Sequence, residues 1–340
     1  MIVQTEFGKI KPSNFKPSIA LTNSHLQTIW PKFGLKSPIN NFVRERIKTP
    51  DNDFLDLDWK LPKKQQALVV LFHGLEGSSR SHYIEHLVEV LYKNDIGSVT
   101  MHFRGCSGQS NLTSISYHSG ATFDPEYIIP LVKQRYASIP LFAIGFSLGG
   151  NMLMKLAANN ASLPIEAFAC ISAPLNLAAS SEAINIGFSK VYQNHLMTSM
   201  KTNVINKMKT VDMGGKLKLS ENEIQQLKTF NQFDEHITAP LHGFKGADDY
   251  YLKCSAINDL GAITKPTLII HALDDPFMDA RVIPRAEQIN QNVAYEFSQF
   301  GGHVGFLNSI TGQSKLWLPQ RLLSFVLEQL PKEARNDCTV

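Results

Sequence analysis

Short apolar runs alternate with helical patterns along most of this sequence, and the alternation limits the folds open to it. Each run has the length of a buried strand; we expect strands at 41–48, 53–60, 67–72, 97–103, 141–146, 165–171, 266–271 and 293–297. The segment 81–93, between two of them, has apolar residues at helical spacing. Strands that alternate with helices form a mostly parallel sheet flanked by helices, so the sequence predicts the α/β class.

The second expected strand has a different pattern. Across 53–60 apolar residues alternate with polar ones: Leu55, Leu57 and Trp59 with Asp56, Asp58 and Lys60. A strand with one apolar and one polar face is typical of the margin of a sheet. We therefore expect one face of this strand to be exposed to solvent.

The alternation stops between residues 175 and 264. This stretch is helical in pattern, rich in Lys, Asn, Gln and Met, and contains no run typical of a buried strand. We interpret it as a helical cap, 175–264, inserted between two parts of one core, 1–174 and 265–340. An apolar stripe in the cap predicts substrate contacts from Tyr192, Leu196 and Met197. The alternative is that the stripe only packs the cap onto the core.

Composition excludes several classes of protein. Of 340 residues, 43% are hydrophobic, and 33 basic residues against 30 acidic ones leave a net charge of only +3, which disfavours nucleic acid as a partner. No apolar run approaches the ~20 residues of a membrane span, and residues 1–10 lack the apolar core of a signal peptide. We therefore expect a cytoplasmic protein in which four scattered cysteines are reduced: Cys106, Cys170, Cys254 and Cys338. The oligomeric state stays open.

The motif that carries chemistry is Gly145-Phe146-Ser147-Leu148-Gly149, which follows an apolar strand and precedes a helical segment. A serine hydroxyl becomes a useful nucleophile when it is held exposed and a base removes its proton. A sharp turn from strand to helix holds it in that way, and the glycines leave room for the turn. The motif predicts Ser147 as the nucleophile.

Two later loops supply the partners that a serine nucleophile needs. The strand at 266–271 leads to Asp274 and Asp275, and we favour Asp275 as the acid because it directly precedes the turn at Pro276. Asp274 stays as the alternative, and either aspartate has the simpler reading of a turn residue. His303 follows the last strand behind two glycines and is the candidate base. The chain order Ser, Asp, His is the order of the α/β-hydrolase triad.

The negative charge that develops during acyl transfer needs two backbone N–H donors. We expect one from Leu148, the residue after the nucleophile, and one from Leu75 in His73-Gly74-Leu75. For His73 itself we favour a structural role at the end of its strand.

One rival motif predicts a different chemistry. His82-Tyr83-Ile84-Glu85-His86 matches the zinc peptidase pattern H-x-x-E-H. However, the two histidines lie away from the apolar stripe of their helix, so we expect them to face the surface or a loop. We therefore expect no metal and no cofactor, and activity that survives chelation.

Together these motifs resemble the YheT-like branch of the α/β-hydrolases, and the resemblance spans nearly the whole chain. It rests on six segments: 23–28, 72–77, 101–108, 145–151, 272–278 and 301–306. The resemblance implies an α/β-hydrolase fold with a triad at Ser147, Asp275 and His303. Eukaryotic members hydrolyse medium-chain or glycerol-linked acyl esters, and some transfer acyl groups to alcohols.

The residues and the resemblance together predict a serine esterase that acts on a small-molecule ester, with short- to medium-chain acyl groups expected. One alternative is an acyltransferase, in which an alcohol replaces water in the second half-reaction. Another is a non-enzymatic binding module on a hydrolase fold, which is disfavoured because all three triad candidates are present.

Overall fold

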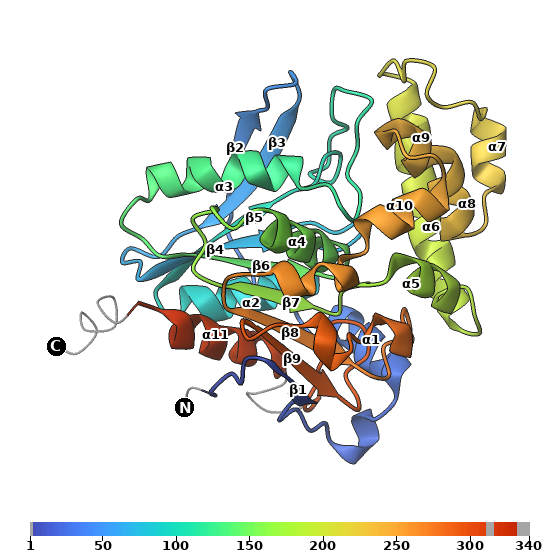
Figure 1. Ribbon diagram of the computed structural model, residues 1–340. Helices are drawn as coiled ribbons and strands as arrows, with labels where there is room; N and C mark the ends of the chain where they lie inside the picture. Colours follow the sequence, from blue (N-terminus) through green and yellow to red (C-terminus); the bar gives the residue numbers. More distant parts are fainter. Residues whose placement is uncertain (1–2, 311–315, 332–340) are drawn as a thin grey trace.

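The computed structural model describes residues 3–310 and 316–331, so Cys338 lies outside the described residues. Nine strands form a single sheet in the order β1-β9-β8-β7-β6-β4-β5-β3-β2 (Figure 1). Their bounds are β1 Lys9–Pro12, β2 Val43–Lys48, β3 Phe54–Lys60, β4 Ala67–Phe72, β5 Ile96–Met101, β6 Leu141–Phe146, β7 Phe168–Ile171, β8 Thr267–Ala272 and β9 Val293–Ser298. Only the β2–β3 and β3–β5 pairs are antiparallel. The predicted α/β-hydrolase fold with a mostly parallel sheet is confirmed.

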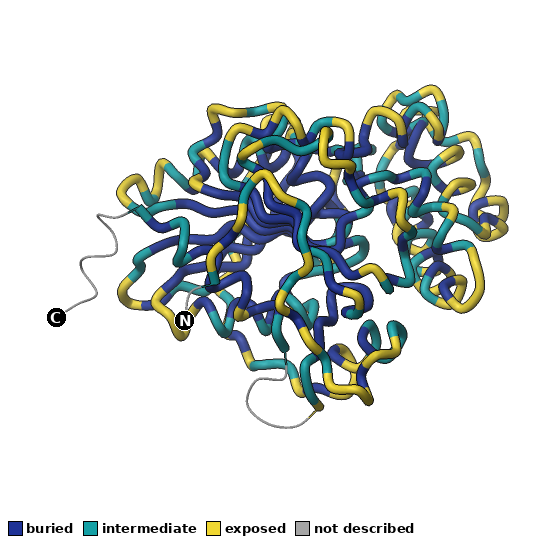
Figure 2. Tube along the Cα trace, turned by 60° about the horizontal axis from the view of Figure 1, so that its bottom comes forward, coloured by how far each residue is buried: buried dark blue, intermediate teal, exposed yellow. Residues whose placement is uncertain are grey.

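Helices cover both faces of the sheet. The core helices and short turns are η1 Ile19–Leu21, α1 Ser24–Phe33, α2 His82–Tyr92, α3 Phe123–Arg135, α4 Leu148–Asn159, η5 Ala280–Val282, η6 Ala286–Gln288 and α11 Leu318–Gln329. Figure 1 shows α3 and α4 on one face and α2 and α11 on the other. The central strands are buried along their length, as the dark tube in Figure 2 shows, because both faces carry apolar side chains.

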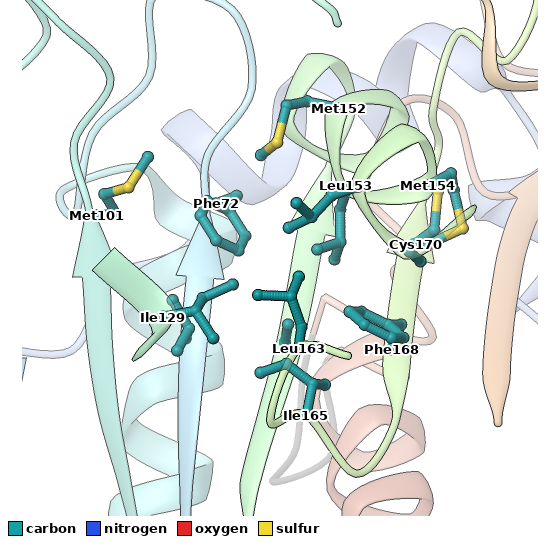
Figure 3. Close-up of a cluster of buried hydrophobic side chains, with 14 of the residues drawn as sticks. Phe72, Met101, Ile129, Met152, Leu153, Met154, Leu163, Ile165, Phe168 and Cys170 are labelled. Atoms are coloured by element: carbon teal, nitrogen blue, oxygen red, sulfur yellow. The ribbon is translucent and has the colours of Figure 1, made fainter. Parts of the chain in front are cut away.

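The larger core cluster lies between the sheet and helices α3 and α4. Figure 3 shows side chains from β4, β5, α3, α4 and β7 meeting there, including Phe72, Met101, Ile129, Leu153 and Phe168. A second cluster on the opposite face joins α2 and α11 to the same strands. Burial on both faces fixes the carboxyl ends of β6, β8 and β9, from which the candidate site residues project.

The predicted exposed face of β3 is wrong. β3 lies inside the sheet between β2 and β5, and Asp56 and Asp58 are 2% and 3% exposed. Arg46 and Arg44 on β2 cover them with paired hydrogen bonds at 2.7–2.9 Å. A carboxylate can be buried when a guanidinium donates to both its oxygens. The polar residues that alternate along β3 therefore form ion pairs with β2 and are not exposed to solvent.

The segment between β7 and β8 is helical. It contains α5 Leu177–Ala183, α6 Ser189–Met208, α7 Glu221–Gln226, α8 Phe230–Phe233, η2 Asp234–Thr238, α9 Ala239–His242, α10 Ala247–Cys254, η3 Ala256–Asn258 and η4 Leu260–Ala262. Most of these helices stand beside the sheet in Figure 1 and share an apolar cluster of their own. The turns η3 and η4 instead pack against α4, and their apolar residues belong to the main core.

Two further features bear on location. Across 3–310 and 316–331, every helix is too short or too polar to cross a membrane. The three cysteines in these ranges, Cys106, Cys170 and Cys254, are free thiols.

Candidate active site

Ser147 occupies the turn between β6 and α4, where the sequence places its nucleophile. Its backbone angles are φ 51° and ψ −121°, a conformation that costs free energy for a residue with a Cβ and is typical of functional sites. A Cβ at Gly145 would overlap the backbone of Gly149, and one at Gly149 would overlap the carbonyl of His73. The two glycines of the motif are therefore required by space.

A hydrogen-bonded chain runs from Ser147 to a buried carboxylate. His303 Nε2 lies 3.0 Å from Ser147 Oγ, and His303 Nδ1 lies 2.8 Å from Asp275 Oδ2. Because a carboxylate only accepts, Nδ1–H donates to Asp275, which leaves Nε2 to accept the proton of Ser147. Asp275 also accepts from the Phe277 N–H at 2.9 Å, so both of its oxygens are held. This arrangement can activate a serine hydroxyl.

Asp274, the alternative acid, has a different place. Its Oδ1 accepts from the N–H of Gly302 at 2.9 Å, so it holds the loop that carries His303 instead of the imidazole. Burial raises the pKa of Asp274 to about 6. The structure thus brings Ser147, His303 and Asp275 together and leaves Asp274 beside them as a support.

Helix α1 also holds the histidine loop, a role that no pattern in the sequence predicts. Thr28 Oγ1 accepts from the N–H of His303 at 2.9 Å. The buried amide of Gln27 donates to the carbonyl of Leu307 at 3.0 Å and accepts from its N–H at 2.7 Å. Gln27 and Leu307 are 280 positions apart, so only the fold reveals the contact. The segment 23–28 was noted in the sequence only as part of a resemblance. In the structure it holds the loop that carries His303.

The backbone around Leu75 is arranged as an oxyanion site requires. The N–H of Gly74 donates to the Tyr83 hydroxyl at 2.9 Å, and the N–H of Glu76 donates to the Tyr117 hydroxyl at 3.0 Å. The amides on both sides of Leu75 are thus occupied, and Leu75 itself lines a cavity together with Leu148. This placement supports the N–H groups of Leu75 and Leu148 as candidate donors.

His73 has the structural role that its position suggests. It is fully buried, and its Nε2 accepts from the N–H of Phe103 at 3.2 Å. Burial lowers the pKa of His73 to about 3, so the ring stays neutral near pH 7.

A cavity of about 110 Å³ adjoins Leu75 and Leu148. The cap forms one side of it through α6, α8, η2 and α10, and the loop after β5 forms another. Its apolar lining consists of Leu75, Leu148, Met200, Val204, Phe233 and Ile237, and polar and charged side chains make up much of the remainder. Ser147 itself is not part of this wall, but its neighbour Leu148 is, and a cavity with an apolar part suits an acyl chain.

The three cap residues predicted to contact substrate do not line this cavity. Met197 is 2% exposed and packs in the core of the cap. Tyr192 lies elsewhere: its ring is 5.1 Å from that of Phe277, and its hydroxyl is 3.1 Å from His25 Nδ1. Leu196 is partly buried. The α6 residues that do line the cavity, beginning at Met200, lie further along the helix.

The rival zinc motif lies on α2. We expected its histidines to face the surface or a loop. Both are partly exposed, and α1 and α11 pack against this helix. Burial lowers the pKa of His82 to about 3, and the Nε2 atoms of His82 and His86 are both buried. Glu85 lies 3.4 Å from Arg80 Nη1. In the part of the chain that the structure describes, no group of three or more His, Cys, Asp or Glu residues is placed to hold a metal ion.

Comparisons with known proteins identify the family to which this chain is similar. Residues 67–309 match the family model described as alpha/beta hydrolase fold. YheT of Escherichia coli strain K12, named as an esterase, is 40% identical over 326 residues, which cover 94% of this chain and 95% of that protein. Phospholipase ABHD3 of Homo sapiens is 28% identical over 327 residues, 92% of this chain and 78% of that protein.

Solved structures show the same fold. The esterase Pf2001 of Pyrococcus furiosus superposes with a TM-score of 0.55 at 17% identity, over 86% of this chain and 94% of that one. At this identity the likeness concerns the fold alone.

Proposed function

Because the chain belongs to the YheT-like branch of the α/β-hydrolases and is a carboxylic ester hydrolase, we propose that it cleaves short- to medium-chain acyl esters through a Ser147–His303–Asp275 triad. The observation that carries this proposal is the hydrogen-bonded chain from Asp275 through His303 to Ser147, at 2.8 and 3.0 Å.

In the first half-reaction, Ser147 Oγ attacks the ester carbonyl while His303 Nε2 takes the hydroxyl proton. The carbonyl oxygen becomes negatively charged and accepts hydrogen bonds from the N–H groups of Leu75 and Leu148. Asp275 keeps the imidazole in the required tautomer and stabilises the imidazolium that forms. The imidazolium then gives its proton to the departing alcohol, and an acyl-serine remains.

In the second half-reaction, His303 takes a proton from water, and the hydroxide attacks the acyl-serine. The imidazolium returns the proton to Ser147 Oγ as the carboxylic acid leaves.

The substrate is a small-molecule ester, and we place the reaction in the cytoplasm, a location supported by the free thiols of Cys106, Cys170 and Cys254.

The test combines Ser147→Ala with a fluorophosphonate, which reacts with activated serines. We expect the parent protein to hydrolyse a panel of p-nitrophenyl esters and to be labelled at Ser147. The variant should fold with the same melting temperature, lose labelling, and lose turnover by a factor of ~10⁶. Turnover within tenfold of the parent would remove Ser147 from the mechanism.

A further inference from the structure

Lys207 is a buried lysine in the wall of the cavity that contains Leu75 and Leu148. It lies in the last turn of α6 and is 6% exposed. Its Nζ donates to two backbone carbonyls, of Ser114 at 3.3 Å and Ile115 at 2.8 Å. Both acceptors are neutral, so neither bond supplies a counter-charge, and one N–H of the ammonium is left for another acceptor.

The other charged side chains of the cavity wall form hydrogen bonds or ion pairs with other side chains. Arg104 is ion-paired with Asp51, Asp53 and Asp124; Glu76 accepts from Tyr117, Ser199 and Asn203; Asp234 accepts from Thr238 and Tyr251. Among the charged groups of this wall that the structure describes, Lys207 is the one whose hydrogen bonds all go to uncharged backbone. A buried cation of this kind is costly until an anion approaches it.

Lys207 lies on the same helix as a residue that contacts the loop of the candidate oxyanion donor Leu75. Asn203, one turn earlier on α6, donates to Glu76, the neighbour of the candidate oxyanion donor Leu75. Lys207 therefore lies about 6 Å further along the helix axis, since four residues rise ~1.5 Å each. Lys207 lines the same cavity as Leu75 and Leu148, and Met200 and Val204, which precede it on α6, contribute apolar side chains to the wall.

We propose that Lys207 binds an anionic group of the substrate, a carboxylate or a phosphate, at the end of the cavity remote from Ser147. The inference rests on the proposed esterase function and narrows its substrate class to esters with a negative charge separated from the scissile bond by an apolar spacer. The anion sits on the acyl chain or on the alcohol, and the experiment separates the two.

Lys207 also fastens the loop at Ser114 and Ile115 to the cap, so a matched control is needed. Lys201 provides it: it lies on the same helix, and its Nζ donates to the backbone carbonyls of Gln225 at 2.8 Å and Leu227 at 3.0 Å. Lys201 makes the same kind of contact without lining the cavity. If Lys207→Met and Lys201→Met both lowered stability and neither changed the preference for charged over neutral esters, the role of Lys207 would be purely structural.

The experiment measures kcat/KM for matched esters. One arm compares p-nitrophenyl esters of ω-carboxyacyl chains of increasing length with neutral esters of equal chain length. The other compares acyl glycerols with the corresponding acyl glycerol phosphates. We expect the parent protein to prefer the charged member by roughly tenfold or more in one arm, because a charge-assisted hydrogen bond is gained. Lys207→Met should reduce that ratio to about one, whereas Lys207→Arg and Lys201→Met should retain it.

Turnover of the neutral ester and fluorophosphonate labelling of Ser147 report on the esterase function separately. Suppose that neutral-ester turnover and labelling persist, but Lys207→Met and the parent protein have the same ratio of kcat/KM for charged and neutral esters in both arms. The anion site is then refuted, while the esterase function is retained. If Lys207→Met does not fold, the ratio for the parent protein and for Lys207→Arg decides: a preference for neutral esters in both arms overturns the proposal.

Discussion

The imidazole of His303 stacks on the ring of Phe277, with centroids 4.0 Å apart and planes inclined by only 10°. Phe277 in turn packs against Tyr192 of the cap helix α6, with centroids 5.1 Å apart. The base of the proposed triad is therefore held on one face by an aromatic ring that also contacts the cap. Phe277 does not react, so we treat it as a residue that positions His303.

Phe277→Leu should lower kcat by about two- to tenfold, because aromatic pairs contribute ~0.5–1.5 kcal/mol beyond buried area. KM should change little, since the ring orients the base and does not bind the acyl chain. Phe277→Tyr retains the stacking and should restore most of the rate. Steady-state kinetics on one short ester checks this, and an equal loss in Leu and Tyr variants would contradict the role of stacking.

The neighbouring aspartates should respond very differently to the same change. Asp275→Asn removes the carboxylate that accepts from His303 Nδ1 and should reduce kcat by ~10⁴. Asp274→Asn keeps an acceptor for the Gly302 N–H. It removes a carboxyl group whose pKa is raised to about 6 by burial, so kcat should fall by less than about tenfold. Parallel measurements of kcat and melting temperature test the pair. A larger loss in the Asp274 variant would reassign the acid.

The triad candidates could be predicted from sequence because each lies within a few residues of the carboxyl end of a strand. A strand that ends in Gly-Phe-Ser or leads into Asp275 places its side chain at the sheet edge whatever the remaining fold does. The cap residues that line the cavity could not be predicted in this way. Met197 and Met200 differ by three positions on α6, and only packing decides which one reaches the cavity. Likewise Thr28, which holds His303 across 275 positions, has no local signature.

Glu76 links the cap to the loop that carries Leu75, a candidate oxyanion donor, and should affect the rate of acylation. Its Oε2 accepts from Ser199 at 2.5 Å and Asn203 at 2.6 Å, and its backbone has φ +55° beside Leu75. Glu76→Gln weakens these bonds and should displace the Leu75 N–H, so we expect kcat to fall by about ten- to a hundredfold. The rate of fluorophosphonate labelling checks this. Ser199→Ala removes one bond and should cost less; the reverse order would contradict the link.

Stability should depend on pH through Asp234. Burial raises its pKa from 3.8 to about 6, so the folded state binds this proton more tightly than the unfolded state. Its contribution to stability is therefore full below about pH 4 and is lost as pH rises through about 6. Asp234→Asn should raise the melting temperature relative to the parent protein at pH 8 more than at pH 4.5. At ~1.4 kcal/mol per pKa unit, the difference is on the order of 2–3 kcal/mol.

Asp249, on α10, is the control with the opposite sign. A hydrogen bond from Lys253 lowers the pKa of its partly exposed carboxyl, so its contribution to stability is present at higher pH and is lost on acidification. Asp249→Asn should therefore lower the melting temperature relative to the parent protein at pH 8 and have less effect at pH 4. Melting curves across this range check both variants, and the same sign of change in the two would contradict the assignment for Asp234.

Selection of the acyl chain should depend on Met200 and not on Met197, although both lie on α6. Met200 lines the cavity, whereas Met197 is 2% exposed in the cap's own core. Met200→Ala opens space beside the acyl chain and should shift the preferred p-nitrophenyl ester to a longer chain, since each buried CH₂ contributes ~0.8 kcal/mol. Met197→Ala should cost ~2–5 kcal/mol of stability and leave the chain-length profile unchanged. A shifted profile in Met197→Ala with an unshifted one in Met200→Ala would place the acyl chain on the other face of α6, toward Tyr192 and Leu196.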